Sequence, residues 1–293
     1  MTGAIPGVLV LGGAGRIGRL LRYRWGPEAA LWQSRQAQTG AGWVAFDPLT
    51  EPDAFQAAAE GQSVLLCLAG PVPGSPSHGA ATGAAADLAD HTRLAEACLK
   101  TAAGVGARVI LASSAAVYGP AVCAREDQPL APVNPYGQAK AQMEARAADL
   151  GAALGVQVTA LRIGNIAGLD AALGGWRPGF RLDQFADGST PKRSYIGAIS
   201  LADVLADLIA LPALPALPPA LNIAQDPPVE MGALLAAGGH DFATAPAPQS
   251  ALPEVALDLC RLKSFVHLNP ATPEGLVAEW AALEPHLEGP PPA

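Results

Sequence analysis

A tyrosine and a lysine stand four residues apart in the run from Asn134 to Lys140. In a helix, side chains at this spacing lie on the same face. An ammonium group beside a phenol lowers the pKa of the phenol by stabilising the phenolate, so Tyr136 could exchange protons near neutral pH. Ser114, which ends an earlier apolar strand, could polarise the oxygen that exchanges this proton. We therefore expect Ser114, Tyr136 and Lys140 to form a catalytic set acting on a carbonyl or an alcohol.

A glycine-rich turn near the start of the chain is a second group with recognisable chemistry. The apolar segment Val8–Leu11 leads into glycines at the register Gly13-x-Gly15-x-x-Gly18 and then into an amphipathic helix. Backbone amides at such a helix start can bind a pyrophosphate. Alone, the pattern is also that of an ordinary glycine-rich turn, but the flanking strand and helix favour a dinucleotide site. The cofactor-binding residues expected here are Gly12, Gly13, Gly15, Arg16, Ile17 and Gly18.

The residues after the next two strands indicate which dinucleotide binds. An acidic residue at the end of the second strand holds the ribose hydroxyls of NAD, whereas a nearby arginine accommodates the 2′-phosphate of NADP. The second strand ends at Ser34 and Arg35, with no Asp or Glu between Glu28 and Asp47. This favours NADP over NAD, although Arg35 could equally be a solvated surface charge. Asp47 is placed either to reach the adenine or to cap the following helix.

The elements that must position these groups form a repeating pattern. Apolar strands alternate with helices at the spacing of right-handed crossovers, which predicts a Rossmann-type α/β fold with a doubly wound parallel sheet and a smaller C-terminal substrate lobe. Leu68 and Ala69, at the end of the fourth strand, are further expected cofactor contacts. The predicted strands are 8–11, 29–35, 43–47, 63–71, 108–112, 161–165 and 221–224, and the main predicted helices are 17–25, 87–103, 135–150, 201–211, 229–237 and 273–283.

The predicted domains follow from the same pattern. We expect a dinucleotide-binding domain over residues 1–167, a substrate-binding lobe over residues 168–288 that is interleaved with the sheet, and a flexible tail over residues 289–293. The segment 71–83 is rich in Pro, Gly and Ser, and its size predicts a lid or substrate loop.

In their order along the chain, these motifs resemble the extended short-chain dehydrogenase/reductase superfamily, which contains NAD(P)-dependent epimerases, dehydratases and reductases. The resemblance rests on Gly12-x-x-Gly15-x-x-Gly18, on the run Ser113–Gly119 and on Tyr136-x-x-x-Lys140. It implies that Tyr136 is the general acid and base, that Lys140 also holds the nicotinamide ribose and that Ser114 orients the substrate oxygen. It further implies substrate contacts from Asn165 and Arg193, the latter being equally consistent with a surface arginine.

Two departures from the family pattern narrow the expected chemistry. Dehydratases of this superfamily carry an acidic pair directly after the catalytic serine, where this chain has Ala115 and Ala116. Dehydratase activity is therefore disfavoured. The family also often has an asparagine in the helix before the fifth strand, and the run 87–92 contains none, so a proton relay through that side chain is not expected.

Three functions are consistent with these residues. The first is an NAD(P)-dependent oxidoreductase that moves a hydride between nicotinamide and a hydroxyl or carbonyl carbon of a small, sugar-like substrate. The second is a sugar or nucleotide-sugar epimerase that retains its cofactor. The third is an NADP-sensing protein without catalysis, which the combination of Ser114, Tyr136 and Lys140 disfavours because a sensor has no need of a tuned phenol.

Composition limits the partners and the compartment. The net charge of -8 disfavours a nucleic-acid partner, because phosphate binding needs clustered Lys and Arg. The sequence shows no signal peptide, membrane span or metal-binding spacing, and its four cysteines, at 67, 98, 123 and 260, are expected to fill the core in a reducing compartment. We expect a cytoplasmic enzyme with a small-molecule substrate, and the resemblance implies a homodimer formed through the helices near 87–103 and 134–150.

Overall fold

The computed structural model describes residues 5, 7–71, 87–214 and 216–287. The chain folds into two compact units: unit 1 is drawn from 1–119, 130–162 and 209–221, and unit 2 from 120–129, 163–208 and 222–293. The chain therefore passes between the units several times. Nearly all of the predicted lid loop, 71–83, and the whole predicted tail, 289–293, lie outside the described residues.

The main sheet has seven strands in the order β11-β6-β5-β4-β1-β2-β3. Strand β1 pairs in parallel with both β2 and β4, so the strand order reverses at β1. This is the switch point at which doubly wound folds bind their ligands. The Rossmann-type fold is thus confirmed. The strands are β1 (Val8–Leu11), β2 (Leu31–Ser34), β3 (Trp43–Ala45), β4 (Val64–Cys67), β5 (Arg108–Ser114), β6 (Val158–Ile163) and β11 (Ala220–Ile223).

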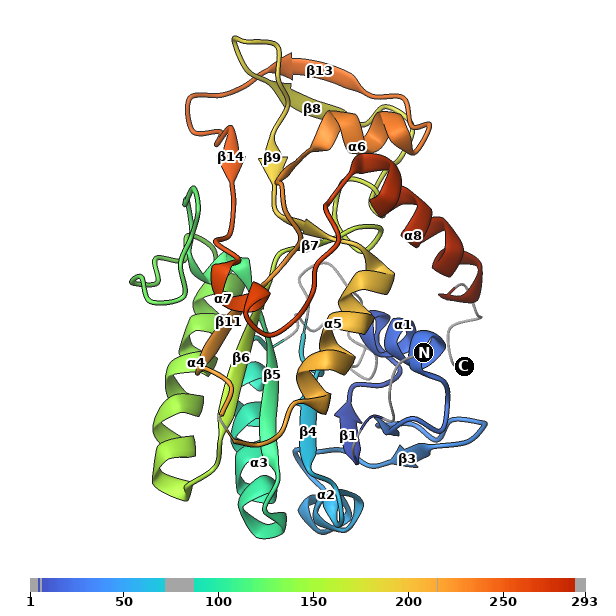
Figure 1. The fold of residues 1–293 in the computed structure, drawn as a ribbon, viewed down its shortest axis with the longest axis vertical. Coiled ribbons are helices and arrows are strands. Elements are labelled where there is room, and N and C mark those ends of the chain that lie inside the picture. The colour runs from blue at the N-terminus through green and yellow to red at the C-terminus, as the bar shows by residue number, and fades with distance from the viewer. Residues whose placement is uncertain (1–4, 6, 72–86, 215, 288–293) are drawn as a thin grey trace. The chain divides into compact units, whose positions relative to one another are not determined.

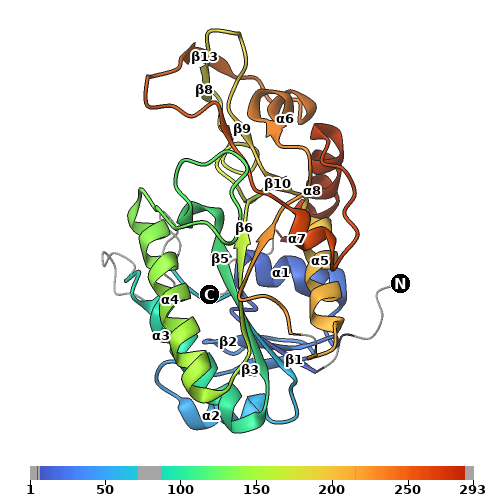
Figure 2. The same cartoon turned by 60° about the vertical axis from the view of Figure 1, so that its left-hand side comes forward.

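Both faces of the central strands are covered, as their continuous apolar sequences require. Every residue of β1 and β4 is buried. Leu9, Leu65 and Val109 belong to the core shared with α2 (Pro52–Ala59), α3 (Asp90–Val105) and α4 (Pro135–Leu154). Helix α1 (Arg16–Trp25) lies on the opposite side of the sheet (Figure 2). The central strands are therefore held in place by packed side chains on both faces of the sheet.

Helix α4 begins where the sequence predicts. Asn134 has extended backbone, and its side-chain oxygen accepts a hydrogen bond of 2.8 Å from the backbone N–H of Gly137. Pro135 occupies the first helical position, where its missing N–H has no cost. At the other end, Gly155 adopts a left-handed conformation with φ of 67° and terminates the helix. Asn134 and Gly155 therefore fix the two ends of α4, the helix that carries Tyr136 and Lys140.

Unit 2 is built from short strand pairs and helices. Its small apolar core includes Leu173, Tyr195 and Leu234. In Figure 1 these elements follow β6 in yellow, orange and red. They are β7 (Asn165–Ile166), β8 (Arg181–Gln184), β9 (Lys192–Arg193), β10 (Tyr195–Ile196), β12 (Val229–Glu230), β13 (Ala243–Pro246), β14 (Glu254–Val255), α5 (Ala198–Ala210), α6 (Met231–Ala237), α7 (Cys260–Lys263) and α8 (Pro273–Leu287), with α5 running on to the boundary of unit 1.

The expectation that all four cysteines fill the core is wrong for two of them. Cys67 and Cys98 are buried, but Cys123 and Cys260 are exposed. The thiol of Cys123 contacts the carboxylate of Asp258 at 3.8 Å. Within the described part of the chain, no helix is both long enough and apolar enough to cross a membrane.

Candidate active site

The glycine-rich turn has the geometry that a dinucleotide pyrophosphate requires. Gly12 has φ of 80°, and a Cβ added to it would lie 2.9 Å from the backbone of Ala69 at the end of β4. A Cβ on Gly18 would lie 2.5 Å from the carbonyl oxygens of Gly12 and Gly13. Only glycine lets the loop approach β4 and α1 approach the loop this closely. The close packing of strand, loop and helix that such a turn needs is therefore present, and binding of a pyrophosphate here remains a prediction.

The start of α1 is suited to an anion. Gly15 precedes the helix and has no side chain to cap it, and the first turn of α1 contains no acidic residue. The first N–H groups of a helix have no intrahelical acceptor, and the helix dipole favours negative charge there. Arg16 is exposed at this position. A bound NAD(P) would place its pyrophosphate here, and the chemistry of these donors fits that group.

The expected adenosine end contains a residue that the sequence analysis missed. The buried side chain of Gln33 accepts a hydrogen bond of 2.9 Å from the N–H of Gly12 and donates one of 2.5 Å to the carbonyl of Phe46. This glutamine ties β2 to the glycine loop and to the segment after β3. The sequence contained one signal for Gln33, namely its position. It stands one residue before Ser34, in the stretch where an acidic residue would indicate NAD.

Ser34, Arg35 and Asp47 occupy different environments. Ser34 is buried, and its hydroxyl accepts a hydrogen bond of 3.3 Å from the N–H of Gln36. Arg35 is exposed at the end of β2. Asp47 accepts a hydrogen bond of 2.9 Å from the N–H of Leu49, so its carboxylate organises the turn before α2. Asp47 does not cap α2, because the N-cap of this helix is Glu51 and no side chain bonds to its first N–H groups. The contact of Asp47 with adenine remains a prediction.

The folded chain brings Ser114, Tyr136 and Lys140 together. Ser114 is the last residue of β5, and its hydroxyl accepts a hydrogen bond of 3.2 Å from the N–H of Ala116, which fixes its rotamer. The hydroxyls of Ser114 and Tyr136 are hydrogen-bonded. The ammonium nitrogen of Lys140 lies 5.8 Å from the centre of the Tyr136 ring and donates a hydrogen bond of 2.7 Å to the carbonyl of Ala112. A phenol, a hydroxyl and an ammonium group thus converge at the end of β5.

The electrostatics of the cofactor-free site differ from the simple expectation for Tyr136. Burial raises the pKa of Tyr136, and the Ser114 hydrogen bond and the charge of Arg16 only partly oppose this. Lys140 is itself buried, which lowers its pKa to about 8. The predicted lowering of the Tyr136 pKa by Lys140 is therefore wrong, because the pKa of Tyr136 is raised. The reason is that desolvation of the phenolate outweighs the attraction of nearby cations.

His91, on the first turn of α3, packs against the catalytic tyrosine. The two rings meet edge to face, with centroids 5.7 Å apart and an interplanar angle of 74°. His91 is 2% exposed, and within the described chain neither ring nitrogen has a partner of hydrogen-bonding geometry. Burial and the nearby charge of Lys140 lower its pKa to about 4, although the carbonyl of Pro71 is close enough to oppose this. The imidazole is therefore neutral at physiological pH.

The two predicted substrate contacts both belong to unit 2. Asn165 starts β7, and its N–H donates a hydrogen bond of 2.9 Å to the carbonyl of Ser194. Arg193 is half-buried, and its guanidinium donates to the carbonyls of Lys192 and Leu252 at 2.6 and 3.2 Å. Burial lowers the pKa of Arg193. The substrate role of both residues remains a prediction.

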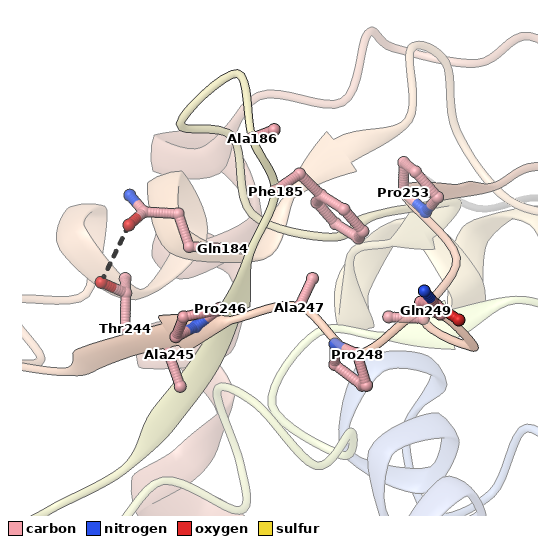
Figure 3. Close-up of a pocket in the computed structure, with 11 residues that line it drawn as sticks. Gln184, Phe185, Ala186, Thr244, Ala245, Pro246, Ala247, Pro248, Gln249 and Pro253 are labelled. Carbon is pink, nitrogen blue, oxygen red and sulfur yellow. Dashed lines mark hydrogen bonds between the residues drawn. The ribbon is translucent and has the colours of Figure 1, made fainter.

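Unit 2 also contains a cavity of about 550 Å³ between β8, β13 and the loop after β13. Figure 3 shows the ring of Phe185 directed into it and Thr244 bonded to Gln184 across the strand pair, at 3.2 Å. None of the residues predicted from the sequence lines this cavity. It is lined by Gln184, Phe185, Ala186, Thr244, Ala245, Pro246, Ala247, Pro248, Gln249, Ala251 and Pro253.

Comparison with known proteins gives one match to a family model and matches to solved structures. The model of the NAD dependent epimerase/dehydratase family matches residues 8–174. UDP-glucose 4-epimerase from Brucella ovis in complex with NAD has a TM-score of 0.74 at 19% identity, covering 93% of this chain and 96% of that one. The enzyme of the same name from Thermus thermophilus, also with NAD, has a TM-score of 0.71 at 18% identity, covering 97% and 99%. At these identities the structures establish the fold.

A curated relative, UDP-glucose 4-epimerase from Azospirillum brasilense, is 43% identical over 88 residues. The match takes in 29% of this chain and 24% of that protein, so the chain spans about a quarter of the length of this relative. The family model covers more than half of the chain, including the glycine-rich turn, Ser114, Tyr136 and Lys140. The resemblance drawn from the sequence is thereby confirmed at the level of the family: the chain belongs to the NAD dependent epimerase/dehydratase family.

Proposed function

We propose that this protein is an NAD(P)-dependent oxidoreductase that acts on a hydroxyl or carbonyl carbon of a small, sugar-like substrate. The observation that carries the proposal is the convergence of Ser114, Tyr136 and Lys140 at the end of β5, in a chain whose glycine-rich turn fits a dinucleotide. A bound nicotinamide would supply or accept the hydride. The side chains of this constellation would handle the proton.

The proton moves between Tyr136 and the substrate oxygen. In the reductive direction the phenol donates its proton to the oxygen as the carbonyl carbon gains hydride, and in the oxidative direction the phenolate takes it back. Ser114 donates a hydrogen bond to the same oxygen and so stabilises the charge that develops there. Lys140 carries a positive charge at neutral pH, and we expect this charge to favour the phenolate as it forms, although burial keeps the pKa of the unreacted Tyr136 raised. The Lys140 pKa of about 8 means that this stabilisation is lost as the pH rises through 8.

We further propose that NADP is preferred to NAD. The support is the exposed Arg35 at the end of β2, where the chain has no acidic side chain to hold the ribose hydroxyls. The related structures named above contain NAD, which makes the preference a point on which this chain would differ from them. We also propose that a homodimer forms through α3 and α4, which light scattering of the purified protein tests directly.

A second candidate function is a sugar or nucleotide-sugar epimerase. It is favoured by the activity of the relatives named above, UDP-glucose 4-epimerase, and by a solved structure of similar fold with UDP-glucuronic acid and NAD. The nicotinamide would accept a hydride from one carbon and return it to the same carbon, the same three residues would handle the proton, and the cofactor would not be consumed. Net change in nicotinamide absorbance during turnover separates the two functions, because only the oxidoreductase produces one.

The test of the catalytic assignment is Tyr136→Phe. This change removes the proton carrier and keeps the ring that packs against His91. We expect turnover to fall by a factor of about 10³ or more, while the dissociation constant for the cofactor changes by less than about threefold. Turnover is measured in a screen of carbonyl and sugar substrates, and cofactor binding by calorimetry. Turnover equal to that of the wild type would rule out Tyr136 as the acid and base.

A further inference from the structure

Unit 1 contains a buried ion pair between α4, the helix that carries Tyr136 and Lys140, and β6. Glu144 on α4 and Arg162 on β6 are 9% and 6% exposed, and their closest charged atoms are 2.7 Å apart. Arg162 donates three hydrogen bonds to the Glu144 carboxylate, at 2.7 to 3.3 Å. The second terminal nitrogen of Arg162 donates to the hydroxyl of Tyr118 at 2.8 Å. All the groups in this network are buried and paired.

The network also includes β5, the strand that ends at Ser114. The hydroxyl of Ser113, the neighbour of Ser114, donates a short hydrogen bond to the Glu144 carboxylate. Glu144 therefore connects α4, which carries Tyr136, to β5, which carries Ser114. Hydrogen bonds to a buried carboxylate are directional and strong, so they define the distance between these two elements more sharply than apolar packing does.

Glu144 also shares a helix face with the active site. Tyr136, Lys140 and Glu144 are spaced four residues apart along α4, so they follow one another along one side of the helix. The carboxylate attracts the Lys140 ammonium and opposes the effect of burial on it. The other titratable group that favours the charged form of Lys140 is Cys67 on β4. Lys140 in turn lowers the pKa of His91 on α3, which is neutral at physiological pH.

From this geometry we propose that Glu144 is a positioning residue for the reaction: paired with Arg162 and bonded to Ser113, it holds the tyrosine helix against the serine strand and keeps Lys140 charged beside the phenol. Glu144 touches neither substrate nor cofactor in this role. It acts through Ser114, Tyr136 and Lys140. The inference rests on the proposed function, since it assigns Glu144 to the same reaction.

The first test is Glu144→Gln, which keeps the size of the side chain and an oxygen for Arg162 but removes the charge. We expect turnover to fall about tenfold. We also expect the alkaline limb of the pH profile of kcat/KM, which Lys140 would place near pH 8, to move down by about one pH unit. A purely structural role would lower turnover or stability without moving this limb. An unchanged limb therefore overturns the proposal.

The matched control is Glu96→Gln. Glu96 forms an ion pair of 2.5 Å with Arg146 that also joins α4 to a neighbouring helix, but on the surface, where the two side chains are 26% and 49% exposed. We expect its turnover and pH profile to equal those of the wild type. A shift of the alkaline limb in this control as large as that in Glu144→Gln would contradict a specific role for Glu144.

A second variant keeps the test decisive if Glu144→Gln fails to fold. Removing one partner of a buried ion pair leaves a buried charge unpaired, whereas replacing both by apolar residues is often tolerated. The double variant Glu144→Met with Arg162→Met should fold and move the same limb in the same direction, because Glu144, and not Arg162, is among the charges acting on Lys140. An unshifted limb in this variant overturns the proposal.

The pH dependence of cofactor affinity, measured by calorimetry, gives the same information without turnover. We expect affinity to weaken above pH 8 in the wild type and above about pH 7 in Glu144→Gln, because a neutral Lys140 no longer holds the nicotinamide ribose. A wild-type protein that binds no dinucleotide, or Tyr136→Phe with full turnover, would refute the proposed function. A wild type that binds and turns over, with Glu144→Gln matching it at every pH, would refute only the role of Glu144.

Discussion

At the scale of single residues, His91 makes the free energy of unfolding depend on pH in the acidic range. Its pKa in the folded state is lowered to about 4 by burial and by the charge of Lys140. An unfolded chain, with an ordinary histidine pKa near 6.5, binds more protons than the folded chain between these two values. The contribution to stability is therefore fully present above about pH 6.5 and is lost as the pH falls toward 4.

We predict that His91→Gln flattens this part of the stability profile. The wild type should lose about 1 to 3 kcal/mol more than the variant between pH 6.5 and 4, after allowance for solvent screening. Denaturant unfolding at several pH values measures the difference. His267, which is exposed, offers a matched control, and His267→Gln should follow the wild-type profile. Parallel profiles for the wild type and His91→Gln would show that the imidazole titrates normally.

Residue types and spacing predicted that Ser114, Tyr136 and Lys140 lie together, but not what surrounds them. Tyr136 and Lys140 share a helix, so their proximity followed from a spacing of four. Glu144 and Arg162 lie on different elements, and no local pattern indicates that these two charges pair in the core. Gln33 was missed for the same reason, because its partner Gly12 is 21 residues away. The pKa of Tyr136 also depends on burial, which spacing does not reveal.

At the scale of elements, the capping of α4 is linked to catalysis. Asn134 is the N-cap of this helix, and the catalytic tyrosine is only two residues further on. We predict that Asn134→Ala lowers the free energy of unfolding by about 1 kcal/mol and also lowers turnover, because the first turn frays and Tyr136 loses its fixed position. Chemical denaturation and steady-state kinetics measure the two effects.

Thr272, which caps α8, is the control for this prediction. Its hydroxyl accepts a hydrogen bond of 3.0 Å from the N–H of Gly275, as Asn134 does for Gly137. Thr272→Ala should cost a similar amount of stability and leave kcat unchanged. If Asn134→Ala loses stability but keeps full turnover, the start of α4 does not control the position of the phenol.

Helix starts were predictable because their signals are local. The pairs Asn134–Pro135 and Thr272–Pro273 both mark the first residues of helices in the structure. Strand ends were less accurate: the strand predicted over 63–71 ends at Cys67, and the one predicted over 29–35 covers 31–34. The ends of a parallel strand depend on the hydrogen bonds of its neighbours, which the sequence of the strand itself does not contain.

At the scale of the whole molecule, each compact unit is built from segments that are distant in the sequence, and sequence patterns do not predict which segments come together. The Rossmann-type sheet followed from alternating strands and helices, and it is confirmed. The segment 120–129, which lies between Ser114 and Tyr136 in the sequence, belongs to unit 2, and the proline-rich segment near 211–219 belongs to unit 1. Such exchanges arise from contacts between distant parts of the chain. The exposure of Cys123 is one result, since it sits in the segment assigned to unit 2.

The measurement that tests the central claim most directly is calorimetric titration of the purified protein with NADP and NAD in parallel. The account predicts saturable binding of a dinucleotide, tighter for NADP, with Arg35→Ala weakening NADP by about tenfold or more and NAD by less than about twofold, because the guanidinium contacts only the 2′-phosphate. Equal loss for both cofactors would contradict the assigned preference. Absence of binding by either would contradict the account itself, because every proposed role of Ser114, Tyr136 and Lys140 depends on a bound nicotinamide.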